Sequence, residues 1–375
     1  MAIAVFDTNT IWRKKPFQAL ARLQDVVLLE PADPIVAWRR RSRNVTEKGT
    51  PVTSGLPVLM PPGWATRWNK MACRRLFDVA SRAAKQRKIR IDQVVVTSPH
   101  YHPMVRICQR LSLPLFYYGS DDYGLYEGWG GTSILRHEAE IVGASQHSFF
   151  VSDPLRQRAI EQYGVNDDRV SLSANATSDE FIRAESPSAI SELFSRVPDL
   201  KRPVVGVVGE INERIDFSLL QRCLDLDVVG SLLVVGPVKS RWQHQGWDKV
   251  RRNPKCIYVG RQPHQSLPVW MQMLDVAIVP YVKSQFNRSC SPMRLYDHLA
   301  SGKPIVATSA CPQSRNVSPF AKVESSHADF ATTVADLIVN RANWESGRQR
   351  DFARKSHTWE SRAIELSRKM ADRPS

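Results

Sequence analysis

Short apolar runs alternate with helix-like segments through the second half of the chain, and this alternation limits the possible folds more than any other feature. The runs are Val204–Val208, Leu232–Val235, Cys256–Val259, Val276–Val279 and Ile305–Ala307. Parallel strands covered by helices on both faces have such continuous apolar sequences, because neither face of the sheet meets water. The pattern therefore predicts an α/β, doubly wound, Rossmann-like domain.

The first half shows the same pattern less regularly. Its apolar runs are Ile3–Phe6, Val26–Leu29, Val94–Val96, Leu115–Tyr118, Ser148–Val151 and Val170–Leu172. A chain of 375 residues that is 42% hydrophobic has room for about two domains. We therefore expect one Rossmann-like domain at residues 1–185 and a second at 200–350. The polar helical pattern from Trp344 to Met370 predicts a C-terminal helix, and we expect residues 351–375 to pack back on the first domain.

Several classes of protein are disfavoured by what the sequence lacks. The six cysteines lie far apart, without the close spacings of a zinc site or a disulfide framework. The first twelve residues lack the basic start, apolar run and small-residue cleavage site of a signal peptide. No apolar run is long enough to cross a bilayer. We expect a cytoplasmic protein with no bound metal.

The net charge of +15 is concentrated near the N-terminus. Residues 1–100 carry 18 Lys and Arg against 7 Asp and Glu, a net charge of +11, whereas the remaining residues carry 34 against 30. Such a surplus predicts an anionic partner for the first domain, either a membrane surface or a nucleic acid.

The stretch SPMRLYDHLASGKPIVAT, from Ser291 to Thr308, carries the clearest chemical signal. Ser291 suits a helix N-cap and Pro292 the first helical position, while Gly302 favours the end of the helix. The N-terminus of this helix should face the carboxyl edge of the sheet, where doubly wound folds bind ligands and helix dipoles attract phosphate.

Two charged residues of this helix fit a nucleotide. Arg294 adds a cation near the expected phosphate position, and the Asp297 carboxylate can accept hydrogen bonds from ribose hydroxyls. An ordinary capped helix with a charged surface would explain the same residues, so the composition alone leaves both interpretations open.

The stretch resembles the Ser-Pro-x-Lys/Arg-Leu-Tyr/Phe-Glu/Asp-x-Leu-Ala-x-Gly-Lys-Pro-Val/Ile-Val segment of GT-B glycosyltransferases, in the group-1 superfamily and its teichuronic-acid-type branch. Supporting segments occur in the same order as in that family, among them VVGVVGEINERIDFSLL, SLLVVGPV and NPKCIYVGRQPHQSLPVWMQMLDVAIVPY. Weaker similarity in the first half includes YYGSDDY and HSFFVSDPLRQRAIEQYGVNDDRVSLSANATSDEF. The resemblance implies two Rossmann-like domains that face a central cleft.

The same resemblance implies a function. A nucleotide-sugar donor, UDP-linked rather than GDP-linked, would give its sugar to a polysaccharide or lipid-linked acceptor during cell-surface glycan synthesis. The enzyme would be a hexosyl- or glycuronosyltransferase that needs neither a metal nor another cofactor. In such enzymes, fixed positive groups stabilise the charge that develops on the leaving diphosphate.

The roles of donor-binding residues are implied position by position. Asp297 takes the place of the acid that binds the donor ribose, and Arg214 that of a phosphate-binding cation. The remaining matched positions are Gly209 at the end of the first strand, Gly260 and Arg261 at the nucleobase, and Ser291, Pro292 and Met293 at the diphosphate. Ser289 departs from the family pattern, which often has Glu eight residues before the ribose-binding acid.

A base for the acceptor hydroxyl should come from the first domain. Asp122, after the strand Leu115–Tyr118, is our first candidate, and His100, after the strand Val94–Val96, is the second. Both follow strand ends, and both also fit loops without a catalytic role. The adjacent acidic pair in SDDY suggests a metal site, but a turn is the interpretation we prefer.

The segment Trp64–Arg90 predicts an amphipathic basic helix, with Trp68 and Met71 on its apolar stripe and Lys70 on its basic one. Such a helix can lie on an anionic membrane, or can simply be half buried in the domain. The basic run Trp38–Arg43 is expected to form a loop.

Two other functions compete with glycosyl transfer. A 2-epimerase would use the same donor pocket without a lipid acceptor. A basic nucleic-acid-binding protein would account for the charge, but the sequence contains no recognised nucleic-acid module, so we expect no nucleic-acid partner.

Overall fold

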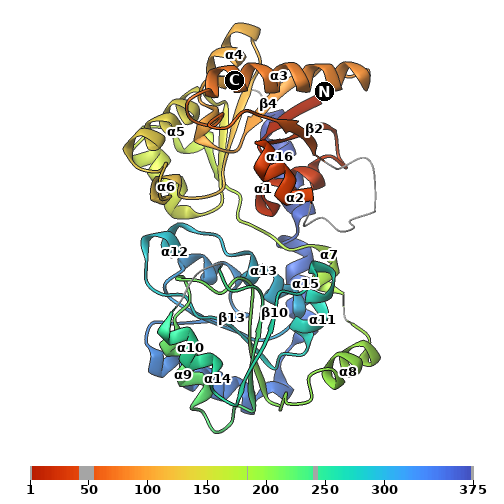
Figure 1. The fold of residues 1–375 in the computed structure, drawn as a ribbon, viewed down its shortest axis with the longest axis vertical. Coiled ribbons are helices and arrows are strands. Elements are labelled where there is room, and N and C mark those ends of the chain that lie inside the picture. The colour runs from red at the N-terminus through yellow and green to blue at the C-terminus, as the bar shows by residue number, and fades with distance from the viewer. Residues whose placement is uncertain (1, 42–54, 184, 240–243, 373–375) are drawn as a thin grey trace. The chain divides into compact units, whose positions relative to one another are not determined.

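The computed structural model describes residues 2–41, 55–183, 185–239 and 244–372. The chain divides into two compact units (Figure 1). Unit 1 comprises Met1–Ala174 and Trp359–Ser375, and unit 2 comprises Asn175–Thr358. Each unit contains one sheet, and all the paired strands are parallel.

Unit 1 has a seven-stranded sheet in the order β3-β2-β1-β4-β5-β6-β7. Its strands are β1 (Ala2–Phe6), β2 (Asp25–Ala32), β3 (Leu56–Leu59), β4 (Ile91–Val96), β5 (Leu115–Gly119), β6 (His147–Phe150) and β7 (Val170–Leu172). Its helices are α1 (Ile11–Leu20), α2 (Pro34–Arg41), α3 (Asn69–Gln86), α4 (Met104–Leu111), α5 (Thr132–Ala144), α6 (Asp153–Glu161) and α16 (Trp359–Ala371). Every residue of β1, β5 and β6 is buried, as a sheet covered on both faces requires.

Unit 2 has a six-stranded sheet in the order β10-β9-β8-β11-β12-β13. Its strands are β8 (Val204–Val208), β9 (Ser231–Val235), β10 (Cys256–Gly260), β11 (Val276–Val279), β12 (Ile305–Thr308) and β13 (Ala321–Glu324). Its helices are α7 (Asp179–Ile182), α8 (Pro187–Ser195), α9 (Phe217–Leu224), α10 (Gln245–Arg251), α11 (Leu267–Gln272), α12 (Gln285–Ser289), α13 (Met293–Ser301), α14 (His327–Val339) and α15 (Ser346–Ser356). The strand order reverses between β8 and β11, which is where doubly wound sheets bind ligands.

The limits of the two units differ from the expected ones. Residues from Asn175 onward belong to unit 2, because Asn175 and Thr177 hydrogen-bond to Ser291 and Asp297. Unit 2 also continues to Thr358, beyond the expected limit at residue 350.

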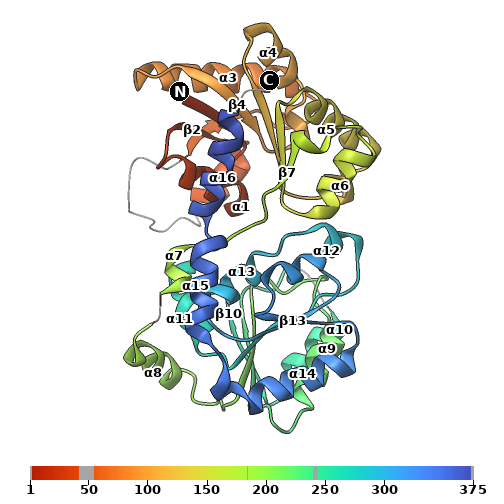
Figure 2. The ribbon, with the colours of Figure 1, turned by 180° about the vertical axis from the view of Figure 1, so that it is seen from behind.

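The polar pattern that predicts one C-terminal helix corresponds to two. The helices α15 and α16 are separated at His357 and Thr358, and they belong to different units. Figure 2 shows α16 beside α1 in unit 1. Gln93 donates to the Met370 carbonyl at 2.9 Å and Arg362 to the Ala174 carbonyl at 2.9 Å, which ties α16 to unit 1.

The expected loop at Trp38–Arg43 is partly wrong. The chain is helical from Pro34 to Arg41. Asp33 accepts the Val36 amide at 2.8 Å and so caps the start of this helix. Positions 42 and 43 lie outside the described residues.

Candidate functional site

Three glycines follow or end adjacent strands at the carboxyl edge of the unit 2 sheet. Gly209 follows β8, Gly236 follows β9 and Gly260 ends β10, and all three have positive φ. The Gly209 amide donates to the Val235 carbonyl and the Gly236 amide to the Gly260 carbonyl, each at 2.8 Å. A Cβ on Gly236 would overlap with the Gly209 carbonyl oxygen, so the backbones can approach this closely only without side chains.

Arg294, on the first turn of α13, lies directly over Gly209. Its Nη2 donates to the Glu210 carbonyl at 3.0 Å, and a Cβ on Gly209 would lie 2.7 Å from the same nitrogen. Nη1 is buried and has no hydrogen-bond partner among the residues that the structure describes. A buried guanidinium N–H without a partner is costly unless an anion accepts from it.

A second guanidinium lies over the same aromatic ring. Arg214 lies 4.7 Å and Arg294 lies 5.3 Å from the centre of the Tyr281 ring, which follows β11. Arg214 also lies 4.9 Å from the Phe286 ring, and its Nε donates to Asn287 at 2.7 Å. These contacts fix two positive charges at the point where the strand order reverses.

The start of α13 differs by one residue from the prediction. Pro292 is the N-cap and Met293 the first helical residue, and no side chain caps this end. Ser291 has another task, because its hydroxyl accepts the Asn175 amide at 3.0 Å and its carbonyl accepts from the Asn175 side chain at 2.6 Å. The other end is as predicted, with Gly302 in the left-handed conformation.

Asp297 lies one turn beyond the start of α13 and is buried. One of its carboxylate oxygens accepts from the Thr177 hydroxyl at 2.8 Å. The Thr177 amide in turn donates to the His357 carbonyl at 2.8 Å, which fixes the hydroxyl. Asp297 therefore has a defined orientation, and its contact with ribose stays a prediction.

The family pattern also singles out the positions of Ser289 and Arg261. Ser289 is buried at the end of α12. Arg261 is exposed immediately after β10, on the far edge of the sheet from β13. The role of Arg261 at the nucleobase stays a prediction.

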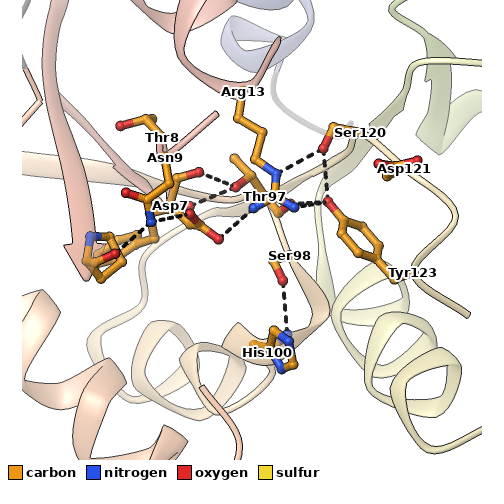
Figure 3. Close-up of polar contacts among 12 residues, drawn as sticks. Asp7, Thr8, Asn9, Arg13, Thr97, Ser98, His100, Ser120, Asp121 and Tyr123 are labelled. Atoms are coloured by element: carbon orange, nitrogen blue, oxygen red, sulfur yellow. Dashed lines mark hydrogen bonds and ion pairs between the residues drawn. The ribbon is translucent and has the colours of Figure 1, made fainter. Parts of the chain in front are cut away.

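A polar network occupies the carboxyl edge of the unit 1 sheet, after β1, β4 and β5 (Figure 3). Arg13 is its centre, with Nη1 2.7 Å from Asp7, Nε 3.1 Å from Ser120 and Nη2 3.1 Å from the Tyr123 hydroxyl. Tyr123 donates to the Thr97 carbonyl at 2.6 Å. Burial alone would lower the pKa of Arg13, but Tyr123 and Asp7 raise it above the ordinary value, so the guanidinium stays charged.

Asp7 has a backbone φ of 73°, an uncommon conformation for a residue with a side chain. Its carboxylate accepts from Asn9 and Arg13, each at 2.7 Å, and its carbonyl accepts from the Thr97 hydroxyl at 2.8 Å. These contacts stabilise the strained turn. Such strain is frequently found where a protein positions groups for function.

His100 lies at the same edge, next to aromatic side chains. Its ring centre lies 4.6 Å from that of Trp129, which is itself 4.7 Å from Tyr126. Burial lowers the pKa of His100 to about 4, so the imidazole is neutral at pH 7. Partly exposed aromatic rings beside a neutral imidazole are suited to the face of a sugar ring and to one of its hydroxyls.

Asp122, the first candidate base, has a different environment. It is 2% exposed, and its two carboxylate oxygens lie 2.8 Å and 2.5 Å from the Arg158 guanidinium. Both carboxylate oxygens are thus held by one guanidinium, and this geometry favours a structural role. The neighbouring Asp121 accepts from the Tyr126 hydroxyl. No cluster of three metal-ligating side chains occurs in the described ranges.

Sequence reasoning did not select several residues of these two groups. In unit 1 they are Asp7, Asn9, Arg13, Ser120 and Tyr123, and in unit 2 they are Tyr281, Asn287, Asn175 and Thr177. The sequence DTN directly after the first apolar run was an available signal, since polar residues at that edge commonly bind ligands. The contacts of Asn175 and Thr177 join residues more than 100 positions apart, and no local pattern predicts them.

Comparison with known proteins agrees with this architecture. No family model matches the chain. A segment of 138 residues is 29% identical to TuaH of Bacillus subtilis (strain 168), which is assigned to teichuronic acid biosynthesis as a glycosyltransferase; the match covers 36% of this chain and about a third, 34%, of that relative.

Solved structures match over nearly the whole chain. HepE of Anabaena in complex with UDP has a TM-score of 0.73, 12% identity and 99% coverage of both chains. Sucrose-phosphate synthase of Thermosynechococcus elongatus has a TM-score of 0.70, 14% identity and 98% coverage of both chains. The fold is therefore GT-B, and the resemblance in the sequence is confirmed at this level.

Proposed function

We propose that this protein is a glycosyltransferase that moves a sugar from a nucleotide-sugar donor to a hydroxyl of a polysaccharide or lipid-linked acceptor. The observation that carries the proposal is the pair of guanidinium groups on Tyr281, because Arg294 has a buried Nη1 that needs an anionic acceptor. The GT-B fold and the sequence relative TuaH support this reading. HepE was solved with UDP and with UDP-glucose, which makes UDP our choice of nucleotide.

In the proposed reaction the bond between the anomeric carbon and the diphosphate oxygen breaks, and the acceptor oxygen bonds to that carbon. Negative charge grows on the leaving diphosphate, and Arg214 and Arg294 would stabilise it together with the backbone at Ser291–Met293. Because these fixed charges do the work of a cation, we propose that no bound metal is required, and that EDTA leaves turnover unchanged. Asp297 would hold the ribose.

The acceptor hydroxyl must lose a proton, and we propose His100 as the group that accepts it. Its neutral ring has a lone pair available at pH 7, whereas the carboxylate of Asp122 is taken by Arg158. The ring of Trp129 would stack on the acceptor sugar. Whether the transferred sugar is a hexose or a uronic acid depends on contacts at Ser289, where the family's usual Glu is replaced.

The test is turnover with a panel of UDP- and GDP-sugars, with UDP binding measured by calorimetry. We expect Arg294→Gln to weaken UDP binding by about tenfold or more, because a hydrogen bond to a charged group contributes roughly 1.5 to 3 kcal/mol. Arg252→Gln, an exposed arginine after α10, is the control and should bind UDP normally.

Equal UDP affinity in Arg294→Gln and the parent would contradict the proposed donor site. Release of a free epimerised monosaccharide, without transfer to any acceptor, would identify an epimerase instead. His100→Gln should reduce turnover strongly while leaving UDP affinity within about twofold, since the proposed base does not touch the nucleotide.

We also propose that the enzyme works in the cytoplasm, at the inner face of the membrane, where a lipid-linked acceptor would reside. In the described ranges, no helix is both long enough and apolar enough to cross a bilayer. We propose that the surface of unit 1 makes the membrane contact.

A further inference from the structure

An apolar surface is exposed where α2, β3 and α3 of unit 1 come together. Leu59 and Met71 are 55% exposed and Trp68 is 46% exposed. Ile35 and Trp38, which lie on α2 within four positions of Pro34, are 60% and 69% exposed. We propose that this surface, the docking face, binds unit 1 to an anionic phospholipid bilayer.

A hollow of about 380 Å³ joins the three elements. It is lined by Pro34, Leu59, Met60, Pro61, Trp68, Met71, Ala72 and Arg75. Pro34 at the start of α2, Leu59 and Met71 therefore belong to one continuous surface. The edge strand β3 contributes Leu59, α3 contributes Met71, and Trp68 is the N-cap residue just before α3. A hollow of this size and lining can accept part of an acyl chain.

The packing of α3 leaves this surface uncovered. Leu76, Ala80 and Ala84 of α3 are buried in unit 1, so they form the face of the helix that packs against the domain. Met71 and Trp68, at the start of the same helix, remain exposed. The sequence left open whether the apolar stripe with these two residues is buried or lies on a membrane, and this end of the stripe is exposed. Contiguous exposed apolar side chains on a folded protein commonly mark a binding surface.

Basic side chains border the docking face. The sequence of α3 contains five Lys or Arg and one Asp, and Lys70, Arg74 and Arg75 are exposed beside Met71. Large apolar side chains that would enter the hydrocarbon boundary, with cations that would meet anionic headgroups, are the features of an interfacial surface. A nucleic acid would match the charge, but its phosphates give no reason for two exposed tryptophans and three aliphatic side chains.

The docking face extends the proposed function, because a protein held at the bilayer is close to a lipid-linked acceptor. That advantage rests on the proposed function, whereas binding to the bilayer does not depend on it. The two are separable by experiment. Vesicle binding needs no substrate, and sugar transfer to a water-soluble acceptor needs no vesicle.

The test is co-sedimentation of the full-length protein with vesicles of phosphatidylcholine, with and without phosphatidylglycerol. We expect binding only to the anionic vesicles, and a loss of about tenfold or more in both Trp68→Ser/Met71→Ser and Lys70→Glu/Arg74→Glu. All four side chains are exposed, so the variants should fold, which UDP affinity and the circular dichroism spectrum would verify.

Two matched controls distinguish binding through the docking face from non-specific effects of exposed apolar side chains and of net charge. Leu111→Ser/Ile364→Ser removes two exposed apolar residues elsewhere in unit 1, and Lys249→Glu/Arg252→Glu changes the net charge equally on unit 2. Both should bind vesicles within about twofold of the parent. Equal losses in the controls, full binding by Trp68→Ser/Met71→Ser, or binding to RNA but not to vesicles would overturn the proposal.

Discussion

At the scale of single residues, Asp297 and Thr177 form a pair whose roles differ. Asp297 is the proposed contact to ribose, and Thr177 orients it through a 2.8 Å hydrogen bond. We predict that Asp297→Ala weakens UDP binding by about tenfold and abolishes the preference for UDP over 2′-deoxy-UDP, as calorimetry would measure.

Thr177→Val is the companion variant for this pair. It keeps the shape of the side chain and removes the hydroxyl, so we expect a smaller loss of affinity and a preserved preference for the ribose. A normal preference in Asp297→Ala would show that the ribose is bound elsewhere.

His298 gives a prediction about acid stability. Its ring is fully buried, neither ring nitrogen has a hydrogen-bond partner among the described residues, and burial lowers its pKa to about 3. The unfolded chain binds a proton there below about pH 6.5 and the folded chain does not. The contribution of His298 to stability is therefore complete above pH 6.5 and is lost as the pH falls toward 3.

We predict that unfolding of His298→Leu takes up about one proton fewer than unfolding of the parent between about pH 4 and 6. The slope of the free energy of unfolding against pH should fall by about 1.4 kcal/mol per pH unit between about pH 4 and 6. Urea unfolding at several pH values measures this slope. An unchanged slope would mean that the folded protein protonates His298 as easily as the unfolded chain does.

At the scale of elements, the turn after β8 packs against α13, because Arg294 of that helix donates to the Glu210 carbonyl. Gly209 has a φ of 127° and faces Arg294, so a Cβ would be strained and would displace the guanidinium. We predict that Gly209→Ala destabilises the protein by about 1 to 3 kcal/mol and weakens UDP binding as well. Thermal unfolding and calorimetry measure the two effects.

Gly347, near the start of α15, provides the control for this turn. An added Cβ meets no atom within 4 Å there, so Gly347→Ala should be neutral or stabilise by up to about 1 kcal/mol. Similar effects of the two substitutions would show that the turn tolerates a side chain.

The central strands of both sheets were predictable because they are buried on both faces. The runs at Val204–Val208 and Val276–Val279 agree exactly with β8 and β11. The edge strands β3 and β13 were missed. Strand β3 contains Pro57 and exposed leucines, and in β13 the apolar residues alternate with Lys322 and Glu324. These two edge strands lack the continuous apolar signal on which the prediction depended, whereas the edge strands β7 and β10 carry it and were predicted.

The donor side was predictable to the extent that it lies in one local segment. Arg294 and Asp297 are close in sequence, and the resemblance to a known family assigned their roles. The network around Arg13 joins three strand ends, and the bidentate pair of Asp122 with Arg158 crosses 36 positions. Such contacts depend on the folded topology, so the sequence alone does not predict them.

At the scale of the whole molecule, unit 1 is completed by α16, which follows unit 2 in the sequence. Trp359 and Leu366 are buried there, at 3% and 0% exposure. We predict that Leu366→Ala destabilises unit 1 by about 2 to 5 kcal/mol. Hydrogen exchange should accelerate in β1 and β4 and stay unchanged in β8 and β11. Uniform acceleration in both units would contradict this division.

The position of α16 also sets an order for folding on the ribosome. The 184 residues of Asn175–Thr358 must be synthesised after the rest of unit 1 and before its last helix. At the usual rate of about 5 to 20 residues per second, the nascent chain waits roughly 10 to 40 s with that side of its first domain uncovered. During this interval a chaperone that recognises apolar surface has its best opportunity to bind.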